Sequence, residues 1–154
     1  MTSAEKTGSE SLSPAEIAQA MLLADRASAQ LGMELVEIRE GYCKMSMLVR
    51  DDMVNGLGIC HGGLIFSLGD TAFAFACNSR NIRTVALNCT INFLNAANVG
   101  TKLTAEAVEK SLKGRTGLYD VAITNEEGLK IAEFRGTSYG TSAKTYVGID
   151  QVVD

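Results

Sequence analysis

Apolar residues recur at helical spacing between residues 14 and 31. Ser13, Pro14 and Glu16 form a capping box with proline at the first helical position, a pattern typical of a helix start. Gly32 suits the position just after the last turn. The sequence therefore predicts one amphipathic helix over residues 14–31.

Runs with strand character account for much of the remaining chain. Residues 35–38 and 43–49 flank Glu40 and Gly41, which predicts two strands joined by a tight turn. Four further strand-like runs occur at residues 85–94, 102–112, 117–124 and 129–139. Short turns join the last three runs, so we expect these strands to be antiparallel neighbours.

A glycine-rich loop, residues 51–63, leads into a long apolar segment that predicts a helix over residues 63–79. Apolar side chains cover every face of this helix, and a helix that is apolar all round is buried all round. We therefore predict an α+β fold, with one curved antiparallel sheet wrapped around this helix and with Phe66, Phe73 and Phe75 in the core. Five or six strands leave such a helix incompletely covered, so we expect a second copy of the chain to cover the rest.

Composition narrows the class of protein. A chain of 154 residues with 46% hydrophobic residues can bury an ordinary core, and its net charge of −4 disfavours a nucleic-acid-binding protein. We expect residues 1–12, which are polar, to be a disordered tail and residues 13–154 to form a single domain. Residues 1–13 lack the apolar core that a signal peptide needs. The longest apolar stretch, residues 64–77, is too short to span a bilayer. We expect a cytoplasmic protein.

The four cysteines form no C-x-x-C pair, so we expect them to be reduced and largely buried. Cys60 stands beside His61, but adjacent residues rarely point at each other, which disfavours a Cys–His nucleophile. With one histidine and no ligand-like cysteine spacing, we expect neither a metal nor a cofactor.

Asp70 is the only formally charged residue between residues 53 and 79. One interpretation places it on a solvated stripe of the helix, or hydrogen-bonded to the backbone or to Thr71. The other makes it a carboxylate held in apolar surroundings for general-base or nucleophilic chemistry.

His61, Gly62 and Gly63 stand at the start of the same helix. The unpaired N–H groups of a helix N-terminus bind anions and developing oxyanions, and glycine lets a ligand approach the backbone closely. The alternative is a turn that only needs glycine for its conformation.

Gly62 and Asp70 are eight residues apart, which is about 12 Å along a helix. An oxyanion donor and a base or nucleophile must both lie within a few Å of one reacting group. We therefore predict a shared active site in which two antiparallel copies of the helix place Gly62 of one chain opposite Asp70 of the other.

Lys113, Gly114, Arg115 and Thr116 form a basic turn between two predicted strands. It is either an ordinary solvated turn or a phosphate clamp, with a bidentate guanidinium and a lysine point charge.

Residues 55–63, NGLGICHGG, followed by residues 64–74, LIFSLGDTAFA, resemble the signature of hotdog-fold acyl-CoA thioesterases, and most of all the phenylacetate-degradation branch. The resemblance covers roughly residues 31–138. It implies a hotdog fold, dimers paired into homotetramers, and hydrolysis of aryl-acetyl CoA thioesters of the phenylacetyl type, including ring-hydroxylated ones.

The resemblance also implies roles for individual residues. The Gly62 N–H polarises the thioester carbonyl, and Asp70 of the partner subunit acts as nucleophile or as base for water. Asn55 contacts the carboxylate or the attacking water, and His61 supports the loop and the carbonyl environment. The expected substrate and CoA contacts are Gly63, Thr71, Lys113, Arg115 and Thr116.

Two positions depart from this branch. Asn95-Ala96-Ala97 stands where Arg-Pro is usual, at a turn expected to help position the nucleotide end of CoA. Gly69 replaces the more usual alanine, which costs the helix about 1 kcal/mol in propensity. The rival functions are a hydratase or dehydratase, which normally needs a histidine working with an acid, and a non-catalytic acyl-CoA-binding or regulatory module, which does not need Asp70.

Overall fold

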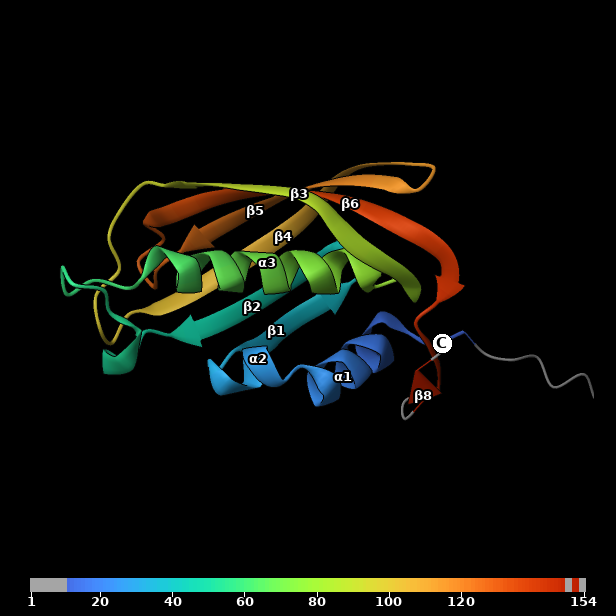
Figure 1. Ribbon diagram of the computed structural model, residues 1–154, viewed down its shortest axis with the longest axis horizontal. Coiled ribbons are helices and arrows are strands. Elements are labelled where there is room, and N and C mark those ends of the chain that lie inside the picture. The colour runs from blue at the N-terminus through green and yellow to red at the C-terminus, as the bar shows by residue number, and fades with distance from the viewer. Residues whose placement is uncertain (1–10, 149–150, 153–154) are drawn as a thin grey trace, which may run out of the picture.

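The computed structural model describes residues 11–148 and 151–152 and shows a six-stranded antiparallel sheet curved around one long helix (Figure 1). Residues 1–10 of the predicted tail lie outside the described residues. The strand order in the sheet is β1-β2-β4-β5-β6-β3. The helices and strands are α1 Pro14–Ala24, α2 Arg26–Gln30, β1 Glu34–Arg39, β2 Tyr42–Leu48, the 3-10 turn η1 Asp51–Met53, α3 Gly62–Asn78, β3 Ile82–Phe93, β4 Lys102–Lys113, β5 Thr116–Thr124, β6 Lys130–Lys144, β7 Tyr146–Gly148 and β8 Gln151–Val152.

The sheet confirms the predicted α+β architecture. Strands β4, β5 and β6 are consecutive antiparallel neighbours, as their short turns predict. Strand β3 pairs with β6 along its length and forms one edge of the sheet, where Val85 and Leu87 are exposed. Within the part of the chain that the structure describes, no helix is long and apolar enough to cross a membrane.

The single helix predicted over residues 14–31 is wrong, because the chain breaks at Asp25. The backbone of Asp25 leaves the helical region at φ −86° and ψ 86°. Its carboxylate accepts a hydrogen bond from the Ser28 N–H at 3.0 Å and caps a second helix, α2. Aspartate competes for backbone donors in this way and favours a cap over a helix interior.

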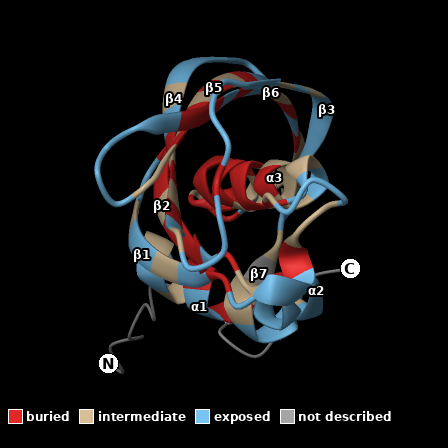
Figure 2. Ribbon diagram, turned by 90° about the vertical axis from the view of Figure 1, so that its left-hand side faces the viewer, coloured by how far each residue is buried: buried red, intermediate tan, exposed pale blue. Residues whose placement is uncertain are grey.

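One chain does not cover α3 completely, as expected from a sheet of five or six strands. Phe73 and Phe75 are fully buried in the core, as expected, whereas Phe66 is half-buried and packs against the core. A stripe on the other side of the helix, which includes Ser67, Asp70 and Ala74, is only half-buried. Figure 2 shows the sheet curving over α3 from β1 on the left to β3 on the right, with the short helices α1 and α2 below it.

Glycines set how closely α3 approaches the sheet. A Cβ atom on Gly69 would lie 3.2 Å from side-chain atoms of Ile123 and Phe134. The absence of a side chain at Gly69 therefore lets the helix pack against β5 and β6, which is a packing reason for the departure from alanine at this position.

Gly136 on β6 makes a closer contact and predicts a stability effect. A Cβ atom there would lie 2.7 to 2.8 Å from the buried Phe73 ring, so Gly136→Ala is expected to destabilise the fold by about 1–3 kcal/mol. Chemical denaturation measures this free energy of unfolding. Gly56→Ala is the control, because no atom lies within 4 Å of its added Cβ, and its effect should stay within about 0.5 kcal/mol. Equal stabilities of the two variants would contradict the packing argument.

Candidate active site

The N-terminus of α3 leaves one backbone donor free. His61 is the N-cap, and its Nδ1 accepts from the Gly63 N–H at 3.0 Å. Its carbonyl oxygen accepts from the N–H groups of Leu64 and Ile65 at 2.9 and 3.3 Å. Among the described residues, no hydrogen bond engages the Gly62 N–H, because the first residue of a helix has no partner one turn earlier. The arrangement presents the Gly62 N–H as the donor that a ligand can use.

Asn55 organises the loop that precedes α3. Its side-chain oxygen accepts from the N–H groups of Leu57 and Ile59 at 2.9 and 3.4 Å. The Cys60 N–H donates to the Ala97 oxygen at 2.8 Å, which ties this loop to the turn at residues 95–97. These segments enclose a cavity of about 340 Å³ lined in part by Asn55, Gly62, Phe93, Asn95, Ala96 and Ala97.

Asp70 lies two turns further along α3, on the half-buried stripe. Burial raises the pKa of its carboxyl group, and a hydrogen bond from the Cys89 thiol, at 3.8 Å from Sγ to Oδ1, opposes this shift. Among the described residues, no lysine or arginine forms an ion pair with Asp70. A partly desolvated carboxylate without a cation is typical of a group that accepts a proton or attacks a substrate.

A second cavity, of about 360 Å³, lies beside Asp70 between α2 and α3. Its polar side chains form a chain of hydrogen bonds: Ser28 Oγ donates to Asp25 at 2.5 Å, and Ser28 Oγ and Thr71 Oγ1 lie 3.2 Å apart. Because the Ser28 proton points to Asp25, Thr71 is the donor in the second bond. The apolar lining residues are Ala27, Leu31, Met33, Phe66 and Ala74.

Gly62 and Asp70 line different cavities, and these two cavities share no residue. One chain therefore does not bring the free N–H and the carboxylate to the same reacting group. The spacing along a single helix already requires this separation, at about 1.5 Å per residue.

Comparison with known proteins gives the family. The sequence pattern of the Thioesterase superfamily matches residues 57–132. The acyl-coenzyme A thioesterase PaaI of Escherichia coli strain K12 is 43% identical over 122 residues, which are 79% of this chain and 87% of that protein. This chain belongs to the thioesterase superfamily.

Solved structures agree with this assignment. The structure of E. coli PaaI, from the phenylacetic acid degradation operon, has a TM-score of 0.84 at 40% identity and covers 85% of this chain and 95% of its own. A hypothetical thioesterase of Streptococcus pneumoniae TIGR4, solved with coenzyme A, has a TM-score of 0.70 at 28% identity, covering 73% of this chain and 88% of its own. The predicted hotdog fold and the resemblance to the phenylacetate-degradation branch are confirmed.

The basic turn of this thioesterase lies at the other end of α3 from Gly62. Gly114 and Arg115 line a small cavity together with Cys77 and Arg80, at the C-terminal end of the helix. The Arg115 guanidinium donates to the Tyr139 hydroxyl at 3.2 Å and is otherwise exposed. Lys113 and Thr116 are exposed beside it. On one chain, the turn is not part of the site at Gly62.

Cys60 does not form a nucleophilic pair with His61. Burial raises the pKa of the Cys60 thiol, and its Sγ lies 3.8 Å from the backbone oxygen of His61. The imidazole of His61 caps α3 instead. Three of the four cysteines are buried and all four are unpaired, as predicted: Cys43, Cys60, Cys77 and Cys89.

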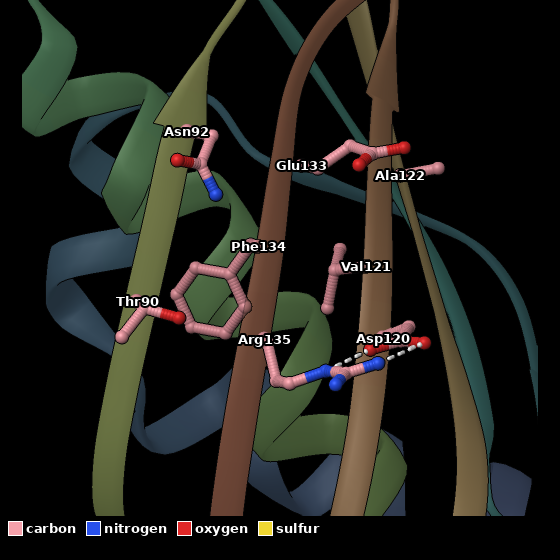
Figure 3. A pocket seen from close by; sticks show the side chains of 8 residues that line it. All are labelled: Thr90, Asn92, Asp120, Val121, Ala122, Glu133, Phe134 and Arg135. Carbon is pink, nitrogen blue, oxygen red and sulfur yellow. Dashed lines mark hydrogen bonds and ion pairs between the residues drawn. The ribbon is translucent and has the colours of Figure 1, made fainter.

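A cavity of about 400 Å³ on the outer face of the sheet holds none of the predicted site residues. Figure 3 shows its side chains, among which the Arg135 guanidinium donates to the Asp120 carboxylate at 2.6 and 2.9 Å. The charged side chains of this cavity are thus paired, Arg135 with Asp120 and Glu133 with Lys130. The free donor and the unpaired carboxylate of the thioesterase lie elsewhere, on α3.

Three residues that the sequence does not single out lie beside Asp70 in the structure. Asp25 and Ser28 were assigned to a continuous helix, although an aspartate three residues before a serine is compatible with a new helix start. Cys89 was expected only to be a reduced, largely buried thiol. Its hydrogen bond to Asp70 joins residues nineteen positions apart, so no local sequence pattern predicts this bond.

Proposed function

We propose that this thioesterase hydrolyses acyl-CoA thioesters at a site shared by two chains. The Gly62 N–H of one chain donates to the thioester oxygen, where negative charge develops, and Asp70 of the partner subunit attacks the carbonyl carbon or activates water. The free Gly62 N–H is the observation that carries the proposal, since a fixed donor aimed at the oxyanion stabilises the transition state. Asn55 contacts the attacking group, and His61 holds the donor in place by capping α3.

Two-fold pairing brings the separated parts together. With two α3 helices antiparallel, the N-terminus of one lies near the middle of the other, and the exposed edge of β3 supplies an apolar contact surface at Val85 and Leu87. The same pairing moves the basic turn of one chain toward the Gly62 end of its partner. We infer that such dimers pair into tetramers, as the resemblance implies.

The basic turn is suited to the phosphates of CoA. Arg115 offers a mostly unoccupied guanidinium, Lys113 a mobile charge and Thr116 a hydroxyl, which are the groups that bind phosphate oxygens. Gly63 and the turn at residues 95–97 border the loop where the pantetheine arm would enter. The complex of the S. pneumoniae relative with coenzyme A supports this choice of substrate class.

The cavity beside Asp70 takes the acyl group, and its chemistry favours a ring that carries a hydroxyl. Its apolar lining suits an aromatic ring. The hydroxyl protons of Ser28, Ser67 and Thr71 are all engaged within the protein, by Asp25, by the Gly63 oxygen and by Ser28. The cavity therefore offers acceptors and no free side-chain donor. An acyl group with a donor, such as hydroxyphenylacetyl, is the complementary substrate.

Thiol release from matched CoA esters tests this proposal. We expect kcat/KM for 4-hydroxyphenylacetyl-CoA to exceed that for 4-methoxyphenylacetyl-CoA by roughly 10- to 100-fold, because only the hydroxyl can donate to the Asp25 carboxylate or to Thr71. In Ser28→Ala the Thr71 proton is released and can be donated to the methoxy oxygen, so the preference should shrink. Phenylacetyl-CoA serves as the reference ester.

Two results would count against the proposal. The absence of thiol release from every ester by folded protein would refute the hydrolytic function with these substrates and favour a binding module. Hydrolysis with equal kcat/KM for the hydroxy and methoxy esters would keep the thioesterase and refute the acceptor-lined acyl site.

A further inference from the structure

The carboxylate of Asp70 has one side-chain hydrogen-bond donor among the described residues, the thiol of Cys89. Cys89 lies in the middle of β3, opposite Gly136 of β6 in the sheet register, and it is half-buried against the core. Its Sγ is 3.8 Å from Oδ1 of Asp70, within the range of a sulfur hydrogen bond. The contact joins the helix that carries the carboxylate to the edge strand.

The thiol keeps its proton at neutral pH. Two effects raise the pKa of Cys89 to about 11: burial, which is the larger, and the negative charge of Asp70. Cys89 is therefore a donor whenever Asp70 is ionised, and not a thiolate that would repel it. A thiol is also a weaker donor than a hydroxyl, so it orients the carboxylate while leaving most of its basicity in place.

We propose that Cys89 is a positioning residue for Asp70, whose S–H bond holds Oδ1 against β3 and leaves Oδ2 free for the thioester carbon or for water. The inference rests on the proposed function, in which Asp70 performs the chemistry. A carboxylate that rotates freely spends less time in the reactive orientation, and orientation contributes directly to the rate. A role limited to folding would leave the pH dependence of catalysis unchanged.

Other titratable groups face Asp70 and stay constant in the test. Asp25, at the junction of α1 and α2, lines the same cavity. Cys77, two turns further along α3, is near enough for the charge of Asp70 to raise the pKa of its thiol, but this thiol lies 3.5 Å from the Ala74 oxygen, to which it donates. Cys43→Ala is the matched control, because it removes a buried thiol on β2 and leaves the bond between Cys89 and Asp70 intact.

The experiment compares wild type, Cys89→Ala, Cys89→Ser and Cys43→Ala in kcat, KM and the pH profile of kcat. We expect Cys89→Ala to lower kcat roughly fivefold with little change in KM, the effect of one hydrogen bond. The acid limb of its profile should move to higher pH, because the ionised form of Asp70 has lost a donor. In Cys89→Ser, a stronger donor, the acid limb should move to lower pH. Cys43→Ala should keep the wild-type profile.

A carbon-13 NMR titration of the Asp70 carboxyl supplies a readout that does not depend on activity. The signal is assigned by its absence in Asp70→Asn, and its pKa should be higher in Cys89→Ala than in wild type. Thermal unfolding confirms that each variant is folded. If both Cys89 variants turn over substrate with the wild-type kcat and the wild-type acid limb, the role of Cys89 is refuted and the proposed function stands. Absence of turnover in wild type would refute the proposed function and the role of Cys89 with it.

Discussion

Asp70→Asn is expected to lower kcat for phenylacetyl-CoA by roughly a thousandfold or more. An amide neither attacks a thioester nor takes a proton from water at neutral pH, while its size and shape match the carboxylate. Substrate should still bind, because the Gly62 donor, the acyl cavity and the basic turn are unchanged. Thiol release measures kcat, and calorimetric titration with the CoA ester measures binding in the inactive variant.

The stability of this variant separates lost chemistry from lost structure. Burial raises the pKa of Asp70, so folding disfavours its ionised form. The protonated carboxyl group therefore favours the folded state at pH values below the pKa of Asp70 in the unfolded chain. This contribution to the free energy of unfolding is lost as pH rises through the higher pKa of the folded state. At neutral pH the asparagine avoids this cost, so we expect Asp70→Asn to unfold at the same temperature as wild type or above it. A lower unfolding temperature would point to a structural role.

Asp120→Asn is the matched control for this change. Its carboxylate lies on the outer face of the sheet, where Arg135 binds it through two hydrogen bonds (Figure 3). We expect kcat to remain within about twofold of wild type, because surface substitutions of this kind have small effects. Loss of activity in the control, or retention of activity in Asp70→Asn, would remove the assignment of Asp70 to the chemistry.

The sequence predicts those parts of the fold that local signals determine. The capping box of Ser13 and Glu16 forms as expected, with the Glu16 side chain accepting from the Ser13 N–H at 2.8 Å. Strands joined by short turns pair as neighbours because the chain has no room to do otherwise. The pairing of β3 with β6 was not predicted, because it joins segments that are separated by two intervening strands.

Hydrophobic periodicity overstates the continuity of the first helix and does not locate the open face of α3. It predicts one helix over residues 14–31, because apolar spacing persists across Asp25. In the structure the Asp25 side chain caps a second helix there, and this cap outweighs the apolar pattern. It also does not show which face of α3 one chain leaves open, because periodicity records which positions are apolar and not how far the sheet wraps. The half-buried stripe that includes Asp70 is therefore visible only in three dimensions.

The same division applies to the candidate site. His61-Gly62-Gly63 and the isolated Asp70 stand out in the sequence because they are chemically unusual where they occur. Their partners do not, because Ser28 meets Thr71 across 43 residues of chain. Side chains that orient a reactive group are thus harder to predict than the group itself, since their identity is common and only their position is special.

Gly62→Pro is expected to lower kcat by roughly 100- to 1,000-fold, the usual effect of removing one oxyanion donor. Proline lacks the N–H group, yet it is favoured at the first position of a helix, which Gly62 occupies in α3. His61 has φ −61° and ψ 130°, a conformation that tolerates a following proline. The substitution therefore deletes the donor and leaves the helix start intact. Gly62→Ala is the control, because it keeps the N–H and meets the same Phe93 ring at 3.0 Å.

Mixing this variant with Asp70→Asn decides whether one site draws on two chains. In a mixed dimer, one site combines the intact Gly62 of the Asp70→Asn chain with the intact Asp70 of the Gly62→Pro chain, and the other site carries both defects. Random exchange makes half of the dimers mixed, so activity should recover to about a quarter of wild type. If each chain carried its own complete site, every site would keep one defect and mixing would restore nothing. Recovery from two nearly inactive proteins thus requires that the donor and the carboxylate act across the subunit interface.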